Sequence, residues 1–149
     1  MSLEKTINSD IKTAMLAKDK KKLEALRAVK AAILLEKTNK GADGDIAENT
    51  EMKILQKLVK QRKDSAELYK SQGRDDLAEE ENFQLSVIEK YLPEQMSEED
   101  IRKTIQEIIS ETGASSMKDM GRVMGMSTKK LVGKADNKLI ASIVKELLS

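Results

Sequence analysis

Hydrophobic residues recur at spacings of three and four along most of the chain, and polar residues fill the positions between them. This spacing places the hydrophobic side chains on one face of an α-helix and predicts a series of amphipathic helices. The first predicted helix follows Ser2 and the second follows Asp19, both of which are typical N-cap residues. Their hydrophobic stripes are Leu3, Ile7, Ile11, Ala14 and Met15 in the first helix, and Leu23, Leu26, Ala28, Val29, Ile33 and Leu34 in the second.

Two longer helices are predicted after residues 39–45, a segment interrupted by two glycines that we expect to form an exposed loop. The first covers residues 48–72, and Gly73 is placed to end it in the left-handed conformation. The second covers residues 74–91, and Pro93 stops it. The two helices are therefore expected to form a long hairpin.

A charged residue interrupts the hydrophobic stripe of each hairpin helix: Arg62 in the first and Glu81 in the second. If the turn is centred near Gln72, these two residues lie at the same height on neighbouring antiparallel helices. Charges set into apolar stripes usually pair, so we predict that Arg62 and Glu81 pair and fix the register of the hairpin. The alternative is that Arg62 binds a ligand.

Residues 93–96 form the predicted boundary between two domains, residues 1–92 and residues 97–149. The second domain begins at Ser97, which opens a capping sequence for another helix. Its isoleucines share one face, and Gly113 ends it. These isoleucines are Ile101, Ile105, Ile108 and Ile109.

The rest of the second domain is predicted to be helical as well. Residues 117–133, punctuated by glycines, are expected to hold one short helix and a helical turn, and residues 136–148 a final helix. The predicted fold is thus all-α, with an N-terminal helical domain that contains the long hairpin and a small C-terminal three-helix domain.

The composition of the 149 residues narrows the possible chemistry. The chain has no cysteine and no histidine, which excludes thiol nucleophiles, Ser-His-Asp catalysis and zinc fingers. Most carboxylates lie in helical charge runs, so we expect no catalytic residue, no metal site and no cofactor. The lack of cysteine suits a reducing compartment, and no apolar run is long enough to span a bilayer. We therefore expect a cytoplasmic protein with no membrane partner.

The formal net charge is only +1, but positive charge is concentrated between Lys118 and Lys138, where six basic residues accompany two acidic ones. Ser127 and Thr128, in the same stretch, are expected at the surface. Lysine and arginine bind phosphate, and glycine allows a close approach to the backbone, so this pattern predicts contact with the phosphates of RNA. The candidate residues are Arg122, Lys129, Lys130, Lys134 and Lys138, with Gly121, Gly125 and Gly133 permitting the approach.

Two other interpretations concern the glycines and a second basic group. Gly121 and Gly125 lie four residues apart, a spacing that would allow tight helix packing, with Val123, Met124 and Met126 in the core. A second group of lysines climbs the helix of residues 48–72 and is interpreted as a solvated face. These lysines are Lys53, Lys57, Lys60 and Lys63.

Several segments resemble the YqeY family, in the right order and over nearly the whole chain. They are residues 59–69, 73–81, 91–93, 120–125 and 133–140. The family resembles the C-terminal tail of the GatB subunit of glutamine-dependent aspartyl/glutamyl-tRNA amidotransferase. Where this chain has Ser127-Thr128-Lys129, the family usually has an apolar pair followed by proline.

The resemblance implies an all-helical protein and a role in tRNA contact, without the catalytic domains of the amidotransferase. The predicted function is therefore a non-catalytic tRNA-binding accessory module related to transamidation. The rival hypothesis is a helical scaffold that binds an aminoacyl-tRNA synthetase or an amidotransferase. A third, carried only by the family label, is a carbon–nitrogen ligase with glutamine as amido donor.

Overall fold

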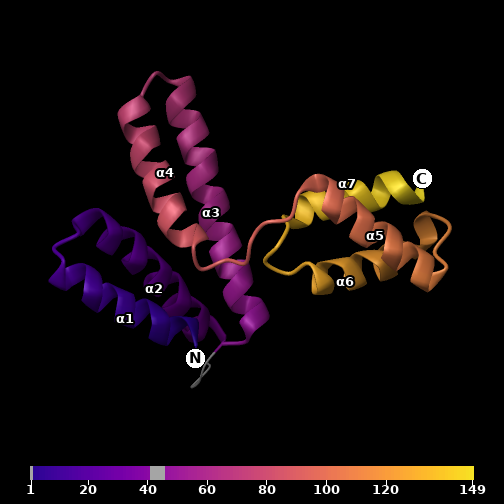
Figure 1. Cartoon of the computed structure of the whole chain (residues 1–149), viewed down its shortest axis with the longest axis horizontal. Helices are drawn as coiled ribbons and strands as arrows, with labels where there is room; N and C mark the ends of the chain where they lie inside the picture. The colour runs from indigo at the N-terminus through magenta and orange to yellow at the C-terminus, as the bar shows by residue number, and fades with distance from the viewer. Residues whose placement is uncertain (1, 41–45) are drawn as a thin grey trace. The chain divides into compact units, whose positions relative to one another are not determined.

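The computed structural model describes residues 2–40 and 46–149. This part of the chain consists of helices and connecting segments and contains no strand, which confirms the prediction of an all-α protein. The chain divides into two compact units, Met1–Leu92 and Pro93–Ser149 (Figure 1).

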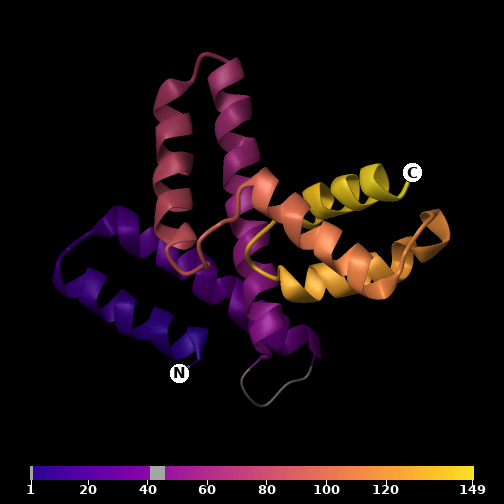
Figure 2. The same ribbon diagram turned by 45° about the vertical axis from the view of Figure 1, so that its right-hand side comes forward.

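Four helices build the N-terminal unit: α1 (Leu3–Leu16), α2 (Lys20–Lys40), α3 (Glu48–Ser71) and α4 (Asp75–Glu89). The first two form a hairpin, and α3 and α4 form a longer one (Figures 1 and 2). Helix α2 packs against both α3 and α4. The end of the longer hairpin extends beyond α1 and α2 in both views.

The predicted start and stop signals act at the ends of these helices. The Ser2 hydroxyl accepts a hydrogen bond from the Lys5 N–H, and the Asp19 carboxylate accepts one from the Lys22 N–H at 3.2 Å. Gly73 adopts a left-handed conformation with φ of 74°. Helix α2 runs further than predicted, through Lys40, and the remainder of the predicted loop, residues 41–45, lies outside the described residues.

The core of the N-terminal unit gathers the hydrophobic stripes of all four helices. Its fully buried members come from α1, α2, α3 and α4 and include Ile7, Leu26, Val29, Ile33, Leu55 and Ile88. The assignment of Met15 to this core is wrong, because its side chain is 55% exposed. Met15 lies in the last turn of α1, where the buried residue is its neighbour Ala14.

The hairpin register differs from the predicted one. Arg62 donates from Nε to Oε1 of Gln84 at 3.2 Å, and no ion pair joins it to Glu81 in the described structure. The turn is centred on Gly73 rather than near Gln72, so the residue that faces Arg62 lies about one helical turn further along α4. The predicted pair of Arg62 and Glu81 is corrected to Arg62 and Gln84.

The C-terminal unit contains α5 (Glu98–Thr112), a 3₁₀ turn η1 (Met117–Asp119), α6 (Met120–Lys130) and α7 (Asn137–Leu148). Ser97 and Asp136 cap α5 and α7, and Gly113 ends α5 in the left-handed conformation. The three helices enclose a core of aliphatic side chains. Its main members are Ile101, Ile105, Ile108, Val123, Leu131, Ile140, Ile143 and Val144.

The segment Pro93–Met96 is part of the C-terminal unit and not only a connection between units. The Met96 N–H donates to the Lys134 carbonyl at 3.0 Å, and Gln95 Nε2 donates to the Gly133 carbonyl at 2.6 Å. Met96 also packs against the core of this unit. The segment therefore holds the turn between α6 and α7 in place.

Candidate nucleic-acid interface

The five basic candidate residues lie on α6, on the turn that follows it and on the first turn of α7. Arg122 is near the start of α6, whereas the four lysines cluster at the opposite end of that helix and just beyond it. All five side chains are exposed. The lysines are Lys129, Lys130, Lys134 and Lys138.

Arg122 has a structural role in the C-terminal unit. Its Nη2 donates to the Thr112 carbonyl and to Asp119 Oδ1, each at 3.3 Å. These bonds join the start of α6 to the end of α5. Arg122 therefore holds two helices together. This structural role distinguishes it from the four candidate lysines.

Asp119 is the acceptor at the centre of this network and is not among the candidate residues that the sequence pattern indicates. Its Oδ2 accepts from the Ser115 N–H at 3.0 Å. The hydrogen bonds from the backbone of Ser115 and Ser116, together with the positive charge of Arg122, hold the pKa of this carboxyl below its usual value. The sequence contains a signal for this turn, because Ser115 and Ser116 lie four and three residues before Asp119, and serine and aspartate favour local turns.

The four lysines share one property: in the described part of the unit, none of them forms an ion pair. They do not share one face. Lys129 lies on the outward side of α6, opposite the buried Ser127. Lys138 shares the outward side of α7 with Lys145, seven residues later.

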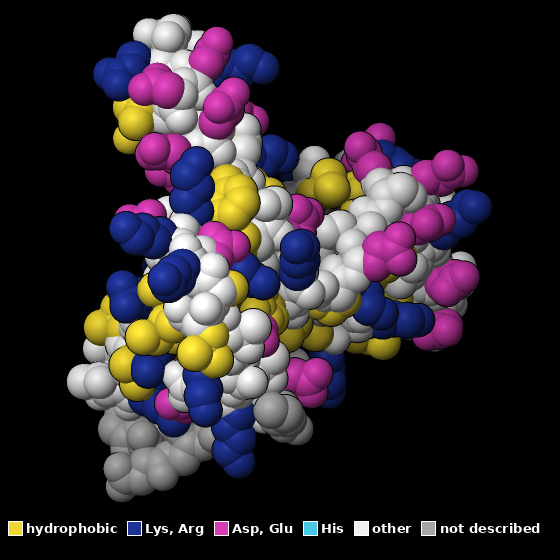
Figure 3. Space-filling view, turned by 60° about the vertical axis from the view of Figure 1, so that its left-hand side comes forward, with side chains coloured by type: hydrophobic (Ala, Val, Ile, Leu, Met, Phe, Trp, Pro, Cys, Tyr) yellow, Lys and Arg dark blue, Asp and Glu magenta, His cyan; other side chains and the backbone are white. Residues whose placement is uncertain are grey.

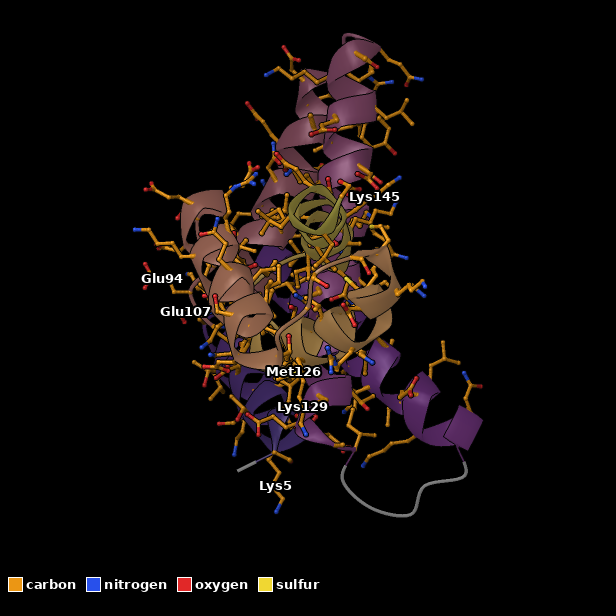
Figure 4. The ribbon with its side chains drawn as sticks, turned by 90° about the vertical axis from the view of Figure 1, so that its right-hand side faces the viewer. Lys5, Glu94, Glu107, Met126, Lys129 and Lys145 are labelled. Atoms are coloured by element: carbon orange, nitrogen blue, oxygen red, sulfur yellow. The ribbon has the colours of Figure 1, made fainter. Side chains whose placement is uncertain are left out.

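Figure 4 places Lys129 and Lys145 on different sides of the C-terminal unit. The outward faces of α6 and α7 thus point in different directions. What the four lysines have in common is their position at one end of the α6–α7 pair: the last turn of α6, the connecting turn and the first turn of α7.

The three candidate glycines have two different environments. Gly121 and Gly125 are exposed, and a Cβ atom added to either would meet nothing within 4 Å. The alternative that they permit tight helix packing is therefore wrong within this unit, and their bare backbone faces outward.

Gly133 cannot offer its backbone to a partner in the same way. It is buried, its φ is +77°, and its carbonyl accepts the hydrogen bond from Gln95. It is a turn glycine required by the left-handed backbone. The prediction that Gly133 permits close approach is corrected for this reason.

The expectation that Ser127 is exposed is also wrong. Its side chain is fully buried in α6, and its hydroxyl has no hydrogen-bond partner. The hydroxyl of the following residue, Thr128, donates to the Met124 carbonyl at 2.9 Å. Polarity alone predicted a surface position, but the helix turns Ser127 onto the same side as Val123.

The second basic group lies on α3. Lys53, Lys57 and Lys63 are exposed and Lys60 is half-buried, and the described residues provide no ion pair for any of the four. This agrees with a solvated face. Residues 2–40 and 46–149 contain no group of three or more acidic side chains that could hold a metal ion, and none of their helices has the length and hydropathy of a membrane span.

Comparison with known proteins adds two kinds of similarity. Residues 4–148 match the YqeY family, described as Yqey-like protein. The chain is 34% identical over 117 residues to "Altered inheritance of mitochondria protein 41, mitochondrial" of Clavispora lusitaniae, covering 76% of this chain and 66% of that protein. It is 36% identical over 130 residues to the protein of the same name in Meyerozyma guilliermondii, covering 81% and 64%.

The chain thus spans just under two thirds of the length of these two relatives. Their mitochondrial names conflict with the predicted cytoplasmic location, which is corrected here. The absence of cysteine excluded a disulfide framework but could not distinguish one reducing compartment from another. Because the match covers almost every residue, the chain belongs to the YqeY family.

Proposed function

We propose that the C-terminal unit binds the phosphate backbone of RNA, with tRNA as the class that the family resemblance favours. The observation that supports this most is the group of exposed lysines at the end of the α6–α7 pair, which have no ion-pair partner in the described unit. They are Lys129, Lys130, Lys134 and Lys138. An RNA strand that crosses this end of the unit would meet them in succession.

The chemistry of these residues suits backbone contact rather than base recognition. An ammonium group is a compact point charge that binds phosphate without distinguishing the base attached to it. The described C-terminal unit carries no aromatic residue on which a base could stack. We therefore expect binding that depends on RNA shape and on salt concentration.

Arg122 is not included among the phosphate ligands, because its guanidinium already bonds Thr112 and Asp119. The exposed backbone at Gly121 and Gly125 remains available for close approach by RNA. The proposed interface therefore contains four lysines and two glycines of the original set.

The test is binding of purified tRNA to the full chain across a salt series. Lys134→Glu combined with Lys138→Glu is expected to weaken binding by at least about tenfold and to lower the salt slope by roughly two units. The matched control is Lys53→Glu combined with Lys57→Glu, which makes the same charge change on α3. If the two pairs weaken binding equally, or neither does, the proposed interface is wrong.

A second candidate function is a protein-binding scaffold, and the α3–α4 hairpin carries the observation that favours it. Leu68 on α3 is 57% exposed and Phe83 on α4 is 38% exposed. Exposed large hydrophobic residues often mark protein contacts. Replacing both by serine should abolish RNA-independent binding to a purified synthetase or amidotransferase and leave tRNA binding unchanged.

The link to glutamine-dependent amide transfer comes from the family resemblance alone. Activity of that kind would release ammonia from glutamine in the presence of the purified chain. A C–N ligase assignment requires that release, and tRNA binding by itself would not establish it.

A further inference from the structure

Two hydrophobic side chains protrude where α1 turns into α2. Leu16 is 78% exposed, the largest exposure of any large hydrophobic residue that the structure describes, and Met15 beside it is 55% exposed. Neither belongs to the core of the N-terminal unit. Two adjacent apolar side chains of this size are costly to leave in water.

The turn that presents them has a defined backbone. The Ala17 N–H donates to the Thr13 carbonyl, the Lys18 N–H to Met15, and the Asp19 N–H to Ala14, all at 3.0–3.1 Å. Lys18 adopts a left-handed conformation with φ of 57° and closes the end of α1. The exposure of Leu16 is thus a consequence of a hydrogen-bonded turn.

The same turn and the helix ends beside it are rich in positive charge. Between Lys12 and Lys22 there are five lysines and one acid, a local charge of +4 in half the length of the C-terminal basic stretch. The one acid, Asp19, is occupied as the N-cap of α2. In the part of the chain that the structure describes, these lysines form no ion pair; they are Lys12, Lys18, Lys20, Lys21 and Lys22.

Figure 3 shows hydrophobic side chains among lysine and arginine side chains over the α1–α2 part of the N-terminal unit. This combination distinguishes between possible partners. RNA phosphates would satisfy the lysines but offer nothing to Leu16 and Met15. A protein interface of ordinary size needs a much larger apolar core than two side chains provide.

We propose that the α1–α2 turn binds the surface of a membrane rich in anionic lipids. Leu16 and Met15 enter the boundary between headgroups and acyl chains, and the lysines contact lipid phosphates. This is peripheral binding and needs no membrane-spanning helix. It departs from the expectation of no membrane partner, which considered only segments long enough to span a bilayer.

The test is cosedimentation of the full chain with vesicles of phosphatidylcholine alone, and of phosphatidylcholine and phosphatidylglycerol in equal parts. We expect binding to the anionic vesicles only. Leu16→Ser should weaken it by roughly tenfold, from the lost apolar burial. Lys20→Glu combined with Lys21→Glu should weaken it by about thirtyfold or more, because each lysine near an anionic surface contributes about 1 kcal/mol.

Two matched controls use the same substitutions elsewhere. Leu35→Ser removes a leucine that is 62% exposed but lies about 22 Å along α2 from Lys20. The variant with this substitution should bind vesicles like the unchanged chain. Lys53→Glu combined with Lys57→Glu reproduces the charge change on α3 and should have a much smaller effect.

The proposal fails if the chain binds neutral and anionic vesicles equally or binds neither. It also fails if Leu16→Ser binds anionic vesicles as well as the unchanged chain does, because the apolar contact would then be absent. Loss of tRNA binding in Leu16→Ser with vesicle binding intact would identify the turn as an RNA surface instead. The RNA interface at Lys134 and Lys138 is tested by other variants, so either proposal can fail without the other.

Discussion

The hydroxyl of Tyr91 donates a hydrogen bond to Oδ2 of Asp10, joining the segment just after α4 to the middle of α1. Burial of the phenol and this hydrogen bond raise the pKa of Tyr91 above its usual value of about 10. The bond connects two elements more than eighty residues apart in the chain. It therefore reports on the packing of the whole N-terminal unit.

The raised pKa predicts a loss of stability in alkali. The unfolded chain releases the Tyr91 proton near pH 10, while the folded chain retains it, so this contribution is complete below pH ~10 and decreases above it. Unfolding by urea at several pH values should show the free energy of unfolding falling above pH ~10. Tyr91→Phe should cost about 1 kcal/mol at neutral pH and flatten that fall. An unchanged alkaline slope in the variant would contradict the assignment.

Replacing Ser127 by alanine should stabilise the C-terminal unit. The substitution removes a buried hydroxyl without a hydrogen-bond partner, and we expect a gain of about 1 kcal/mol in the free energy of unfolding. Ser142→Ala is the control, since Ser142 is an exposed helical serine and reports helix propensity alone. Urea unfolding of both variants measures the difference. A Ser127→Ala variant no more stable than the Ser142→Ala variant would show that the hydroxyl is satisfied in solution.

The glycines should respond to alanine in opposite directions. Gly133→Ala is expected to destabilise the chain by about 1–2 kcal/mol, because the left-handed backbone opposes a Cβ atom. Gly121→Ala and Gly125→Ala should each stabilise α6 by up to about 1 kcal/mol, since both sites are open and alanine favours the helix. If RNA approaches the bare backbone, the latter two variants will nevertheless bind tRNA more weakly. Thermal unfolding and tRNA titration of the same three proteins separate the two effects.

The hairpin register predicts which residue is coupled to Arg62. A double-mutant cycle of Arg62→Ala with Gln84→Ala should give a coupling free energy of about 0.5–1.5 kcal/mol. The same cycle with Glu81→Ala should give a value near zero, because no ion pair joins the two side chains in the described structure. The reverse result would restore the pairing expected from the hydrophobic stripes.

The sequence was sufficient to predict the helices, because the signals that start and end them are local. Ser2, Asp19 and Ser97 cap helices through neighbouring N–H groups, and Gly73 and Gly113 end helices through their own left-handed backbone. The isoleucines of α5 define its buried face by spacing alone. Only the ends of helices shifted, as in α2, which continues through Lys40.

The candidate interface was less accessible to sequence reasoning. The basic stretch appeared as one patch, yet Arg122 bonds to Thr112 and Asp119, and Gly133 is buried with its carbonyl bonded to Gln95. Residues close in sequence separate in space when they lie on different helices, because each helix turns its own outward face away from a shared core. The exposure of Leu16 beside the lysines also depends on tertiary packing, because Ala14 in the same helical turn is buried.

The amino-acid sequence by itself determined the class of fold, the ends of most helices and the lack of thiol and imidazole chemistry, because each depends on composition or on contacts within a few residues. Only the tertiary structure decided the partner of Arg62, the burial of Ser127 and the distribution of the basic residues over different faces. Those features depend on which helix faces meet. A displacement of the hairpin turn by a residue or two is enough to change which residues face each other.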